Sequence, residues 1–312
     1  MRGARAVPAL PMPRATTHLG TALALAFALS AAGCSEEPRD LVWPTSGTVE
    51  PQRLSSSFGP RVRGSRQDTY DWHRGVDIPV PPGSPIYAVS AGKVRRAGDD
   101  PAYNDRIVQL EHCGDSGCFF TNYIHLTAVV VSIGQEVTQG EMLGLSGFGE
   151  TGFPHLHFEL REERPEQDHC VHPLHLLPTP SLVAPQVSIG AINDADPAGA
   201  SVEVSVDVLG QFPILQRVEI VTVDRATGVA IEERVFDVDD WNRTHTSETA
   251  PEMIDSPELD GILVDPGKFN EETLVYTLRL RFSGLQGAAA PGDLRVTARA
   301  SDLLGNESSA SR

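Results

Sequence analysis

The stretch FPHLHFEL (residues 153–160) places two histidines, His155 and His157, one residue apart in an apolar run. Successive side chains of a β-strand point to opposite faces, so the two imidazoles share one face while Leu156 and Phe158 share the other. A half-exposed strand with a polar face would explain this pattern. A metal site would explain it as well, because neutral imidazole is the commonest protein ligand for zinc. The surrounding sequence decides between them.

Short β-branched runs separated by glycine and proline surround this stretch, from about residue 43 to residue 177. No apolar stripe with a 3.6-residue period lies between them, so we expect an antiparallel β-structure. A proline-punctuated segment follows, and we place a linker at residues 178–185. The predicted fold class is all-β.

Residues 186–312 form a second predicted domain. Residues 200–210 (ASVEVSVDVLG) and 274–284 (LVYTLRLRFSG) alternate apolar and polar side chains, as half-buried sandwich strands do. The segment LRVTARASDLLGNES (294–308) resembles the closing strand and turn of immunoglobulin-like modules. The Cys–Trp–Cys pattern of antibody domains is absent, so we expect an immunoglobulin-like β-sandwich of general type.

The net charge of −17 argues against nonspecific binding to nucleic acid, which requires a basic surface. Residues 181–312 carry 22 acidic and 10 basic side chains, a net of −12, which leaves −5 for residues 1–180. This asymmetry supports two domains. It also makes adhesion of the C-terminal domain to anionic wall polymers unfavourable, so we expect that domain to be a spacer or to bind a protein partner.

Residues 1–33 are predicted to be a signal peptide. Arginines precede the apolar run LGTALALAFALSAAG (19–33), which is too short to span a bilayer comfortably. SAAGC (30–34) resembles a bacterial lipobox, which implies lipidation of Cys34 and a polar tether over residues 34–42. Ser35 after the cysteine favours, by resemblance to Gram-negative lipoproteins, an outer-membrane lipoprotein that faces the periplasm.

Three cysteines remain if Cys34 is lipidated. Cys113 and Cys118 flank GDSG, a sequence typical of a hairpin tip, so we expect a disulfide across that turn. Cys170 is then unpaired and is expected to be free and buried.

The segment HRGVD (73–77) places His73 four residues before Asp77, with Gly75 between them. Prolines follow, so the two side chains converge through a bent strand or loop and not on a helix. Two histidines and one aspartate would leave a fourth metal position open for water, as in catalytic zinc sites. An isolated pattern of this kind is common by chance, so its interpretation as part of a metal site depends on the rest of the chain.

The segments SSSFGPRVRG (55–64), HRGVDIPVPPGSPIYAVSAGKV (73–94), NYIHL (122–126) and IGQEVTQGEMLGLSGFGETGFPHLHFEL (133–160) appear in this order. Together they resemble the lysostaphin-type (LytM-type) zinc metalloendopeptidases that cleave peptidoglycan cross-links. The resemblance covers about residues 43–175 and implies a β-sheet core with a groove across it.

By this resemblance, His73, Asp77 and His157 match the zinc ligands, and His125 and His155 match two catalytic histidines. Zinc would polarise the scissile carbonyl and activate water. One histidine would accept the proton of that water, while the other would stabilise the oxyanion or protonate the leaving amine. The sequence is compatible with either assignment.

The other histidines and acidic clusters are interpreted as structural. His112 lies in a strand next to a hairpin. For His169, His172 and His175 no spacing supports a second metal site, and His245 has no candidate partner. The clusters NDAD (193–196) and DVDD (237–240) lack the pattern of a calcium-binding loop and are predicted to be solvated acidic turns.

The sequence therefore predicts a zinc-dependent endopeptidase that hydrolyses peptidoglycan stem-peptide cross-links at the cell envelope. One alternative is a non-catalytic regulator that activates other cell-wall hydrolases. Another is a binding protein whose acidic sandwich holds a partner while the first domain serves as a wall anchor. The retention of all five site residues favours the enzyme. The lipobox favours direct D-alanyl–diaminopimelate links over polyglycine bridges as the substrate.

Overall fold

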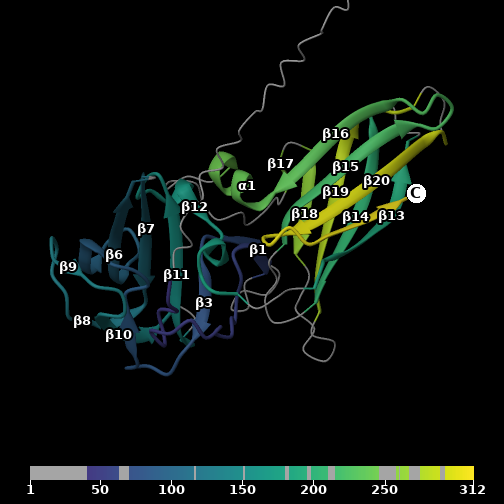
Figure 1. Ribbon diagram of the computed structural model, residues 1–312. Coiled ribbons are helices and arrows are strands. Elements are labelled where there is room, and N and C mark those ends of the chain that lie inside the picture. Colours follow the sequence, from purple (N-terminus) through teal and green to yellow (C-terminus); the bar gives the residue numbers. More distant parts are fainter. Residues whose placement is uncertain are drawn as a thin grey trace, which may run out of the picture. The chain divides into compact units, whose positions relative to one another are not determined.

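The computed structural model describes residues 41–62, 70–115, 117–149, 152–179, 183–194, 198–209, 215–245, 258–259, 261–266, 275–288 and 292–312. These residues are mostly β-strands joined in antiparallel sheets (Figure 1), which confirms the predicted all-β class. The predicted signal peptide and Cys34 lie outside the described residues. Within those residues, no helix combines the length and apolar character needed to cross a bilayer.

The first domain is built on a ten-stranded sheet with the strand order β4-β10-β11-β7-β6-β5-β9, to which β3, β8 and β12 add pairs. A separate two-stranded sheet pairs β1 with β2. The bounds are β1 Gly59–Val62, β2 Tyr70–His73, β3 Val76–Pro79, β4 Pro85–Tyr87, β5 Gly92–Asp100, β6 Asp105–Gly114, β7 Gly117–Ile124, β8 Leu126–Val129, β9 Glu136–Val137, β10 Met142–Phe148, β11 Pro154–Glu162 and β12 Cys170–Val171, with short 3-10 helices at Gln167–His169 and Pro173–His175.

Strand β11 is the histidine strand and lies in the middle of this sheet. It pairs with β3 and β12 along one edge and with β10 and β7 along the other. Leu156 and Phe158 are fully buried in the core, while His155 and His157 point to the opposite face and keep partial exposure. The alternation predicted from the sequence is confirmed.

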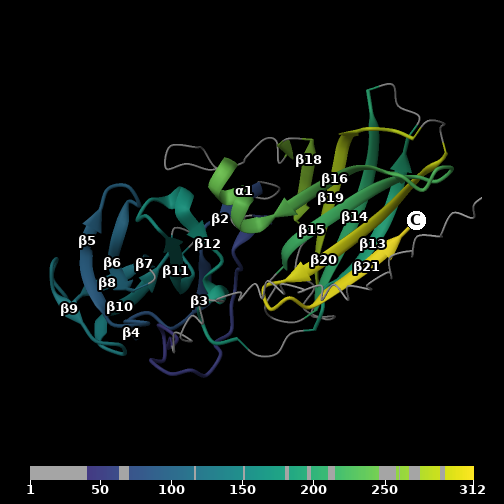
Figure 2. The same ribbon diagram turned by 45° about the horizontal axis from the view of Figure 1, so that its top comes forward.

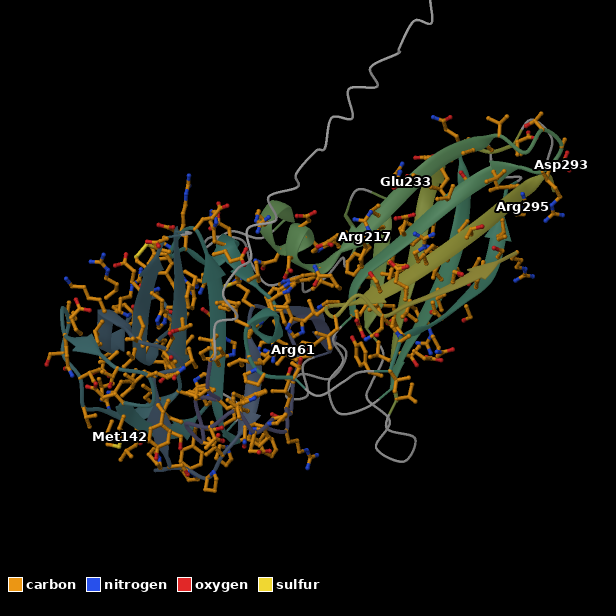
Figure 3. All side chains as sticks on the ribbon, in the orientation of Figure 1. Arg61, Met142, Arg217, Glu233, Asp293 and Arg295 are labelled. Atoms are coloured by element: carbon orange, nitrogen blue, oxygen red, sulfur yellow. A yellow bond between two sulfur atoms is a disulfide. The ribbon has the colours of Figure 1, made fainter. Side chains whose placement is uncertain are left out.

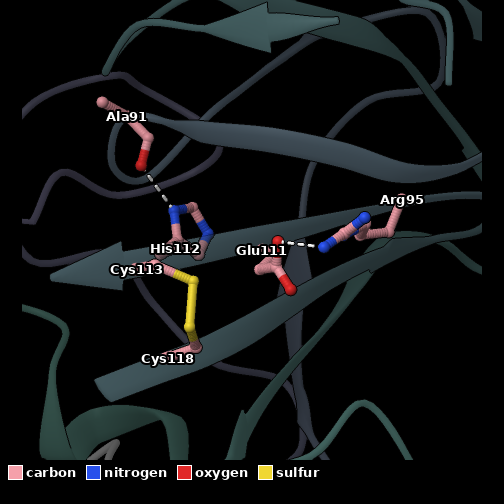
Figure 4. Close-up of a disulfide and its surroundings, with 6 residues drawn as sticks. All are labelled: Ala91, Arg95, Glu111, His112, Cys113 and Cys118. Atoms are coloured by element: carbon pink, nitrogen blue, oxygen red, sulfur yellow. Dashed lines mark hydrogen bonds and ion pairs between the residues drawn. A yellow bond between two sulfur atoms is a disulfide. The ribbon is translucent and has the colours of Figure 1, made fainter. Parts of the chain in front are cut away.

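The hairpin of β6 and β7 carries the predicted disulfide between Cys113 and Cys118, which face each other across the strand pair (Figure 4). His112 is buried beside it, with Nδ1 2.8 Å from the carbonyl oxygen of Ala91 and Nε2 2.8 Å from the Thr121 hydroxyl. Both ring nitrogens are therefore used in hydrogen bonds, as expected for a structural histidine. Cys170 is free and buried, as expected.

The second domain contains two antiparallel sheets, with orders β13-β14-β19-β18-β17 and β16-β15-β20-β21 (Figure 2). Apolar side chains of β14 and β19 and of β15 and β20 are buried between them, which confirms the predicted sandwich. Figure 3 shows charged side chains such as Glu233 and Arg295 on its surface. The bounds are β13 Gln186–Asn193, β14 Ala200–Leu209, β15 Leu215–Asp224, β16 Ala230–Asp237, β17 Glu258–Leu259, β18 Ile262–Pro266, β19 Val275–Leu285, β20 Leu294–Asp302 and β21 Glu307–Ser311.

Residues 237–240 are not the solvated turn that the sequence suggested. They begin helix α1 (Val238–His245), because Oδ1 of Asp237 accepts the backbone N–H groups of Asp239 and Asp240 at 3.1 Å each. Asp239 is buried, and its carboxylate accepts the backbone N–H of His172 at 2.8 Å and lies 2.6 Å from Nε2 of His175. These long-range contacts, together with a hydrogen bond from Nε2 of Gln216 at 3.0 Å, satisfy the buried Asp239 carboxylate.

Trp241 of α1 stacks on Trp72 of β2, with ring centroids 6.1 Å apart, and both rings are nearly fully buried. Trp72 directly precedes His73 in the sequence, so the helix supports the end of β2, where one of the predicted metal ligands lies. The linker at 178–185 and the domain limits around it remain predictions.

We expect Trp241→Ala to lower the free energy of unfolding by about 3–5 kcal/mol, because it removes a large buried ring from between Trp72 and Phe236. The measurement is urea unfolding followed by circular dichroism. Val229→Ala, at an exposed position, is the control and should change stability by no more than about 0.5 kcal/mol. Equal stability of the two variants would contradict this account of the α1 contact.

Candidate metal centre

Three side chains converge where β11 crosses the end of β2 and the start of β3. His73 is the last residue of β2, and the register of β11 with β3 pairs His157 with Asp77. Nε2 of His73 and Nδ1 of His157 lie 3.1 and 3.0 Å from Oδ1 of Asp77, and 2.9 Å from each other. Strand pairing thus assembles the group from segments 80 residues apart.

The donor atoms fit a tetrahedral zinc ion. Zinc binds histidine nitrogen and carboxylate oxygen at about 2.0–2.2 Å, which places neighbouring ligand atoms of a tetrahedron about 3.3–3.6 Å apart. The three observed separations are a few tenths of an ångström shorter, so a small outward movement of the side chains would admit the ion. His73, Asp77 and His157 could therefore hold a metal ion. The described residues include one other group of suitable spacing, Glu111, Cys113 and Cys118, but its sulfur atoms form the disulfide.

Each of the two histidines in this group has its remaining nitrogen next to an acceptor. Nδ1 of His73 lies 2.7 Å from the carbonyl oxygen of Ser57, and Nε2 of His157 lies 3.3 Å from Oε1 of Glu159. These acceptors favour a proton on the outer nitrogen, which leaves a lone pair on the nitrogen that faces the group. The ring orientations suit metal binding.

Burial and neighbouring charges shift the pKa values of all three side chains in the group. Burial lowers the pKa of His73 to about 4, with the Arg61 charge acting in the same direction. Burial alone would raise the pKa of Asp77, but the charge of His73 and hydrogen bonds from both histidines hold it well below its ordinary value. Burial also opposes protonation of His157, yet the bonds and charges of Asp77 and Glu159 raise its pKa to about 9.

Arg61, labelled in Figure 3, contacts the second oxygen of Asp77. Its Nη1 atom donates to Oδ2 of Asp77 at 3.1 Å and to the hydroxyl of Ser56 at 3.1 Å. The guanidinium binds Oδ2 of Asp77, so Oδ1 is the oxygen that faces the two histidines. The Asp77 carboxylate is therefore presented to a metal through Oδ1.

A buried ion pair lies behind His157. Glu159 accepts hydrogen bonds from Nδ2 of Asn122 at 2.9 Å and from Nε of Arg161 at 3.1 Å, and all three side chains are buried. Burial opposes ionisation of Glu159, but the Arg161 charge outweighs it and lowers the pKa of the carboxyl group. A buried carboxylate is tolerated only with such partners. The glutamate therefore stays charged beside His157.

Sequence reasoning missed Glu159, Arg161 and Arg61. The alternation in HFELR (157–161) places Glu159 and Arg161 on the same face as His157, which is the signal that could have revealed them. Charged residues at alternate strand positions usually indicate an exposed face, and here that expectation fails.

The two other histidines of the predicted site lie beside the metal-binding group. His125 follows β7, and its ring centroid is 4.8 Å from that of His155 and 5.9 Å from that of His157. Nε2 of His155 is 3.5 Å from Oδ1 of Asp77, while its Nδ1 lies 2.9 Å from the carbonyl oxygen of Phe153. The structure thus brings all five predicted residues together.

Two glycines provide the space that this arrangement requires. A Cβ atom on Gly75 would lie 2.4 Å from the carbonyl oxygen of Phe158 and 2.9 Å from Nε2 of His157. A Cβ atom on Gly149 would lie 2.4 Å from Cε1 of His155. Any side chain at either position would collide with the strand or with a site histidine.

The model of peptidase family M23 matches residues 71–169, the segment that contains this group. The chain therefore carries an M23 peptidase domain. The resemblance to lysostaphin-type peptidases noted in the sequence is confirmed. Over 109 residues the chain is 36% identical to the peptidoglycan DD-endopeptidase ShyA of Vibrio cholerae, a match that covers 35% of this chain and 24% of that protein.

A second relative, described as the uncharacterized lipoprotein YgeR of Escherichia coli, is 29% identical over 137 residues, covering 44% of this chain and 47% of that protein. Among solved structures, the catalytic domain of lysostaphin from Staphylococcus simulans is 26% identical, with a TM-score of 0.36, and the match covers 41% of this chain and 93% of that one. The chain spans about a quarter of the length of ShyA.

We expect Gly75→Ala in the M23 domain to weaken zinc binding by about 10- to 100-fold, because the added methyl group displaces His157 or the backbone at Phe158. Zinc affinity is measured by competition with a chromophoric chelator. Gly114→Ala, where a Cβ atom meets nothing within 4 Å, is the matched control and should bind zinc normally. Unchanged affinity in Gly75→Ala would contradict the geometry described here.

Proposed function

We propose that the M23 domain is a zinc-dependent endopeptidase that hydrolyses peptide cross-links of peptidoglycan at the cell envelope. The observation that carries the proposal is the convergence of His73, Asp77 and His157, with His125 and His155 directly beside them. Relatives described as peptidoglycan DD-endopeptidases support the substrate class. A direct D-alanyl–diaminopimelate link is the proposed bond.

A zinc ion held by His73, Asp77 and His157 would polarise the scissile carbonyl and lower the pKa of water toward about 7. The ligand set contains one carboxylate and two neutral imidazoles, and it leaves a fourth position for water or substrate. Arg61 and Glu159 keep the ligand atoms aimed at the same point.

His125 and His155 would carry out the proton transfers. Each ring has Nδ1 next to an oxygen acceptor, which leaves the Nε2 lone pair available to take a proton from water and return it to the leaving amine. Burial lowers the pKa of His155, so this ring is neutral near pH 7. Positive charge on either ring would also stabilise an oxyanion.

The alternative role, a non-catalytic activator of other wall hydrolases, would not require His125 and His155 to lie beside the metal-binding group. Their rings are within 5 Å of each other, and His155 contacts the Asp77 carboxylate. The enzyme is therefore favoured over the regulator.

We expect Asp77→Ala to lose both zinc and hydrolysis, because two ligands cannot hold the ion. His125→Ala and His155→Ala should keep zinc and lose about 10²-fold or more in rate. Zinc is measured by atomic spectroscopy, and hydrolysis by mass spectrometry of muropeptides from purified sacculi. Asp99→Ala, an exposed carboxylate outside the site, is the control.

Full zinc occupancy in Asp77→Ala would contradict the ligand assignment. Loss of zinc in His125→Ala or His155→Ala would mean that a ligand and a catalytic residue have been exchanged. Zinc-loaded wild-type protein that stimulates a second hydrolase but cleaves nothing itself would establish the regulator.

Localisation follows from Cys34, which we propose to be lipidated. The relatives YgeR and outer membrane antigenic lipoprotein B of Haemophilus influenzae carry lipoprotein descriptions, which support an envelope address in the outer membrane facing the periplasm. Cys34→Ser should move the protein from the membrane fraction to the soluble periplasmic fraction, as detected by immunoblotting. Unchanged membrane association would refute the lipid anchor.

The acidic sandwich is proposed to be a spacer or a binding site for a protein partner. Its negative charge disfavours nucleic acid and anionic wall polymers alike. Its contact with the metal-binding domain through Trp241 makes it part of the folded unit that presents the site.

A further inference from the structure

Asp105 is the first residue of β6, and its carboxylate accepts two hydrogen bonds. One oxygen, Oδ1, accepts the backbone N–H of Arg106 at 2.6 Å. The other, Oδ2, accepts a hydrogen bond from Nδ1 of His125. Asp105 lies 20 residues from His125 in the sequence, and no motif quoted above includes it.

The backbone at His125 has φ of +66°, a conformation that non-glycine residues adopt rarely. Such strain persists only where the surroundings hold it in place. A Cβ atom on Gly149 would lie 3.2 Å from Nε2 of His125 and 3.1 Å from Nε2 of His155. Nε2 of His125 therefore faces the same space as the other catalytic ring, while Nδ1 faces Asp105.

The two catalytic histidines are not equivalent in their partners. Nδ1 of His155 lies against the neutral backbone carbonyl of Phe153, whereas Nδ1 of His125 lies against the carboxylate of Asp105. A carboxylate is the stronger acceptor and fixes a tautomer more firmly. His125 is thus the ring whose orientation depends on a side chain.

We propose that Asp105 is a positioning residue for the proposed peptidase reaction. Its carboxylate keeps the proton of neutral His125 on Nδ1, so that the Nε2 lone pair faces the reacting water and His125 is the histidine that accepts its proton. This inference rests on the proposed function for its chemistry. The tautomer itself is a property of the protein without metal or substrate.

A carboxylate suits this position because the two donors bind different oxygens, the Arg106 N–H on Oδ1 and Nδ1 of His125 on Oδ2. An asparagine has only one carbonyl oxygen, so it places an acceptor at one of these two positions and an NH2 group at the other. If the oxygen stays with the backbone N–H, the amide NH2 group faces Nδ1 of His125. That contact drives the histidine proton to Nε2 and removes the lone pair from the site.

Asp99 of β5 provides a matched control on the same hairpin. It accepts a hydrogen bond at 3.0 Å from the side chain of Arg106, which also donates to the carbonyl oxygen of Thr127, two residues beyond His125. The side chain of Asp99 is mostly exposed. Asp99→Asn removes one negative charge near the site and leaves the Asp105–His125 pair intact.

The test uses the full-length protein with Asp105→Asn. The substrate is a purified muropeptide dimer joined by a D-alanyl–diaminopimelate link. Nitrogen-15 NMR of the histidine rings, with the His125 signals assigned by comparison with His125→Ala, reports the tautomer with and without zinc. We expect kcat to fall by about 10²-fold or more, KM to change by less than about 2-fold, and zinc content to stay normal.

The His125 proton should move from Nδ1 to Nε2 in Asp105→Asn and stay on Nδ1 in Asp99→Asn, which should keep wild-type kcat. In a His125→Ala background, adding Asp105→Asn should cost no further activity, because Asp105 acts through that ring. An equal loss in both backgrounds would show a merely structural role and overturn the inference.

An unchanged tautomer or a wild-type kcat in Asp105→Asn would overturn it as well. If Asp105→Asn folds poorly, Asp105→Glu decides, since it retains two acceptor oxygens and should restore the Nδ1 proton and part of kcat. Failure of the proposed function appears differently: zinc-loaded wild-type protein would then leave the dimer intact, whatever the tautomer of His125.

Discussion

The antiparallel register of β11 against β3 is the constraint on which the metal-binding group depends. It pairs His157 with Asp77, while the same strand pairs with β7 and so lies close to His125. A shift of one residue would turn His155 and His157 into the core and bring Leu156 and Phe158 out. Those two apolar side chains are fully buried, so the hydrophobic core selects the register that the site requires.

Around the group, the imidazoles have hydrogen-bond acceptors beside their outer nitrogens. His73 faces a backbone carbonyl, whereas His157 and His125 face the carboxylates of Glu159 and Asp105. Buried carboxylates are costly unless they are paired, and removal of one partner is more damaging than replacement of both. Charged side chains next to these imidazoles therefore hold the orientations of their rings.

The second domain takes part in this support. Trp241 of α1 packs on Trp72, the residue before His73, and Asp239 binds the backbone of His172 beyond the histidine strand. The sandwich thus contributes apolar burial next to the strand that ends at His73. The linker predicted at residues 178–185 from their prolines does not reveal that Trp241 and Trp72 pack together across it.

The sequence by itself determined the all-β class, the hairpin disulfide, the facing of His155 and His157, and the family to which residues 71–169 belong. These depend on periodicity and short spacing, which are local properties of the chain. Only the tertiary structure decided the roles suggested for Asp105, Glu159 and Gly149. A carboxylate or a glycine has no local signature of its partner, because the strands that bring the partners together pair across long stretches of sequence.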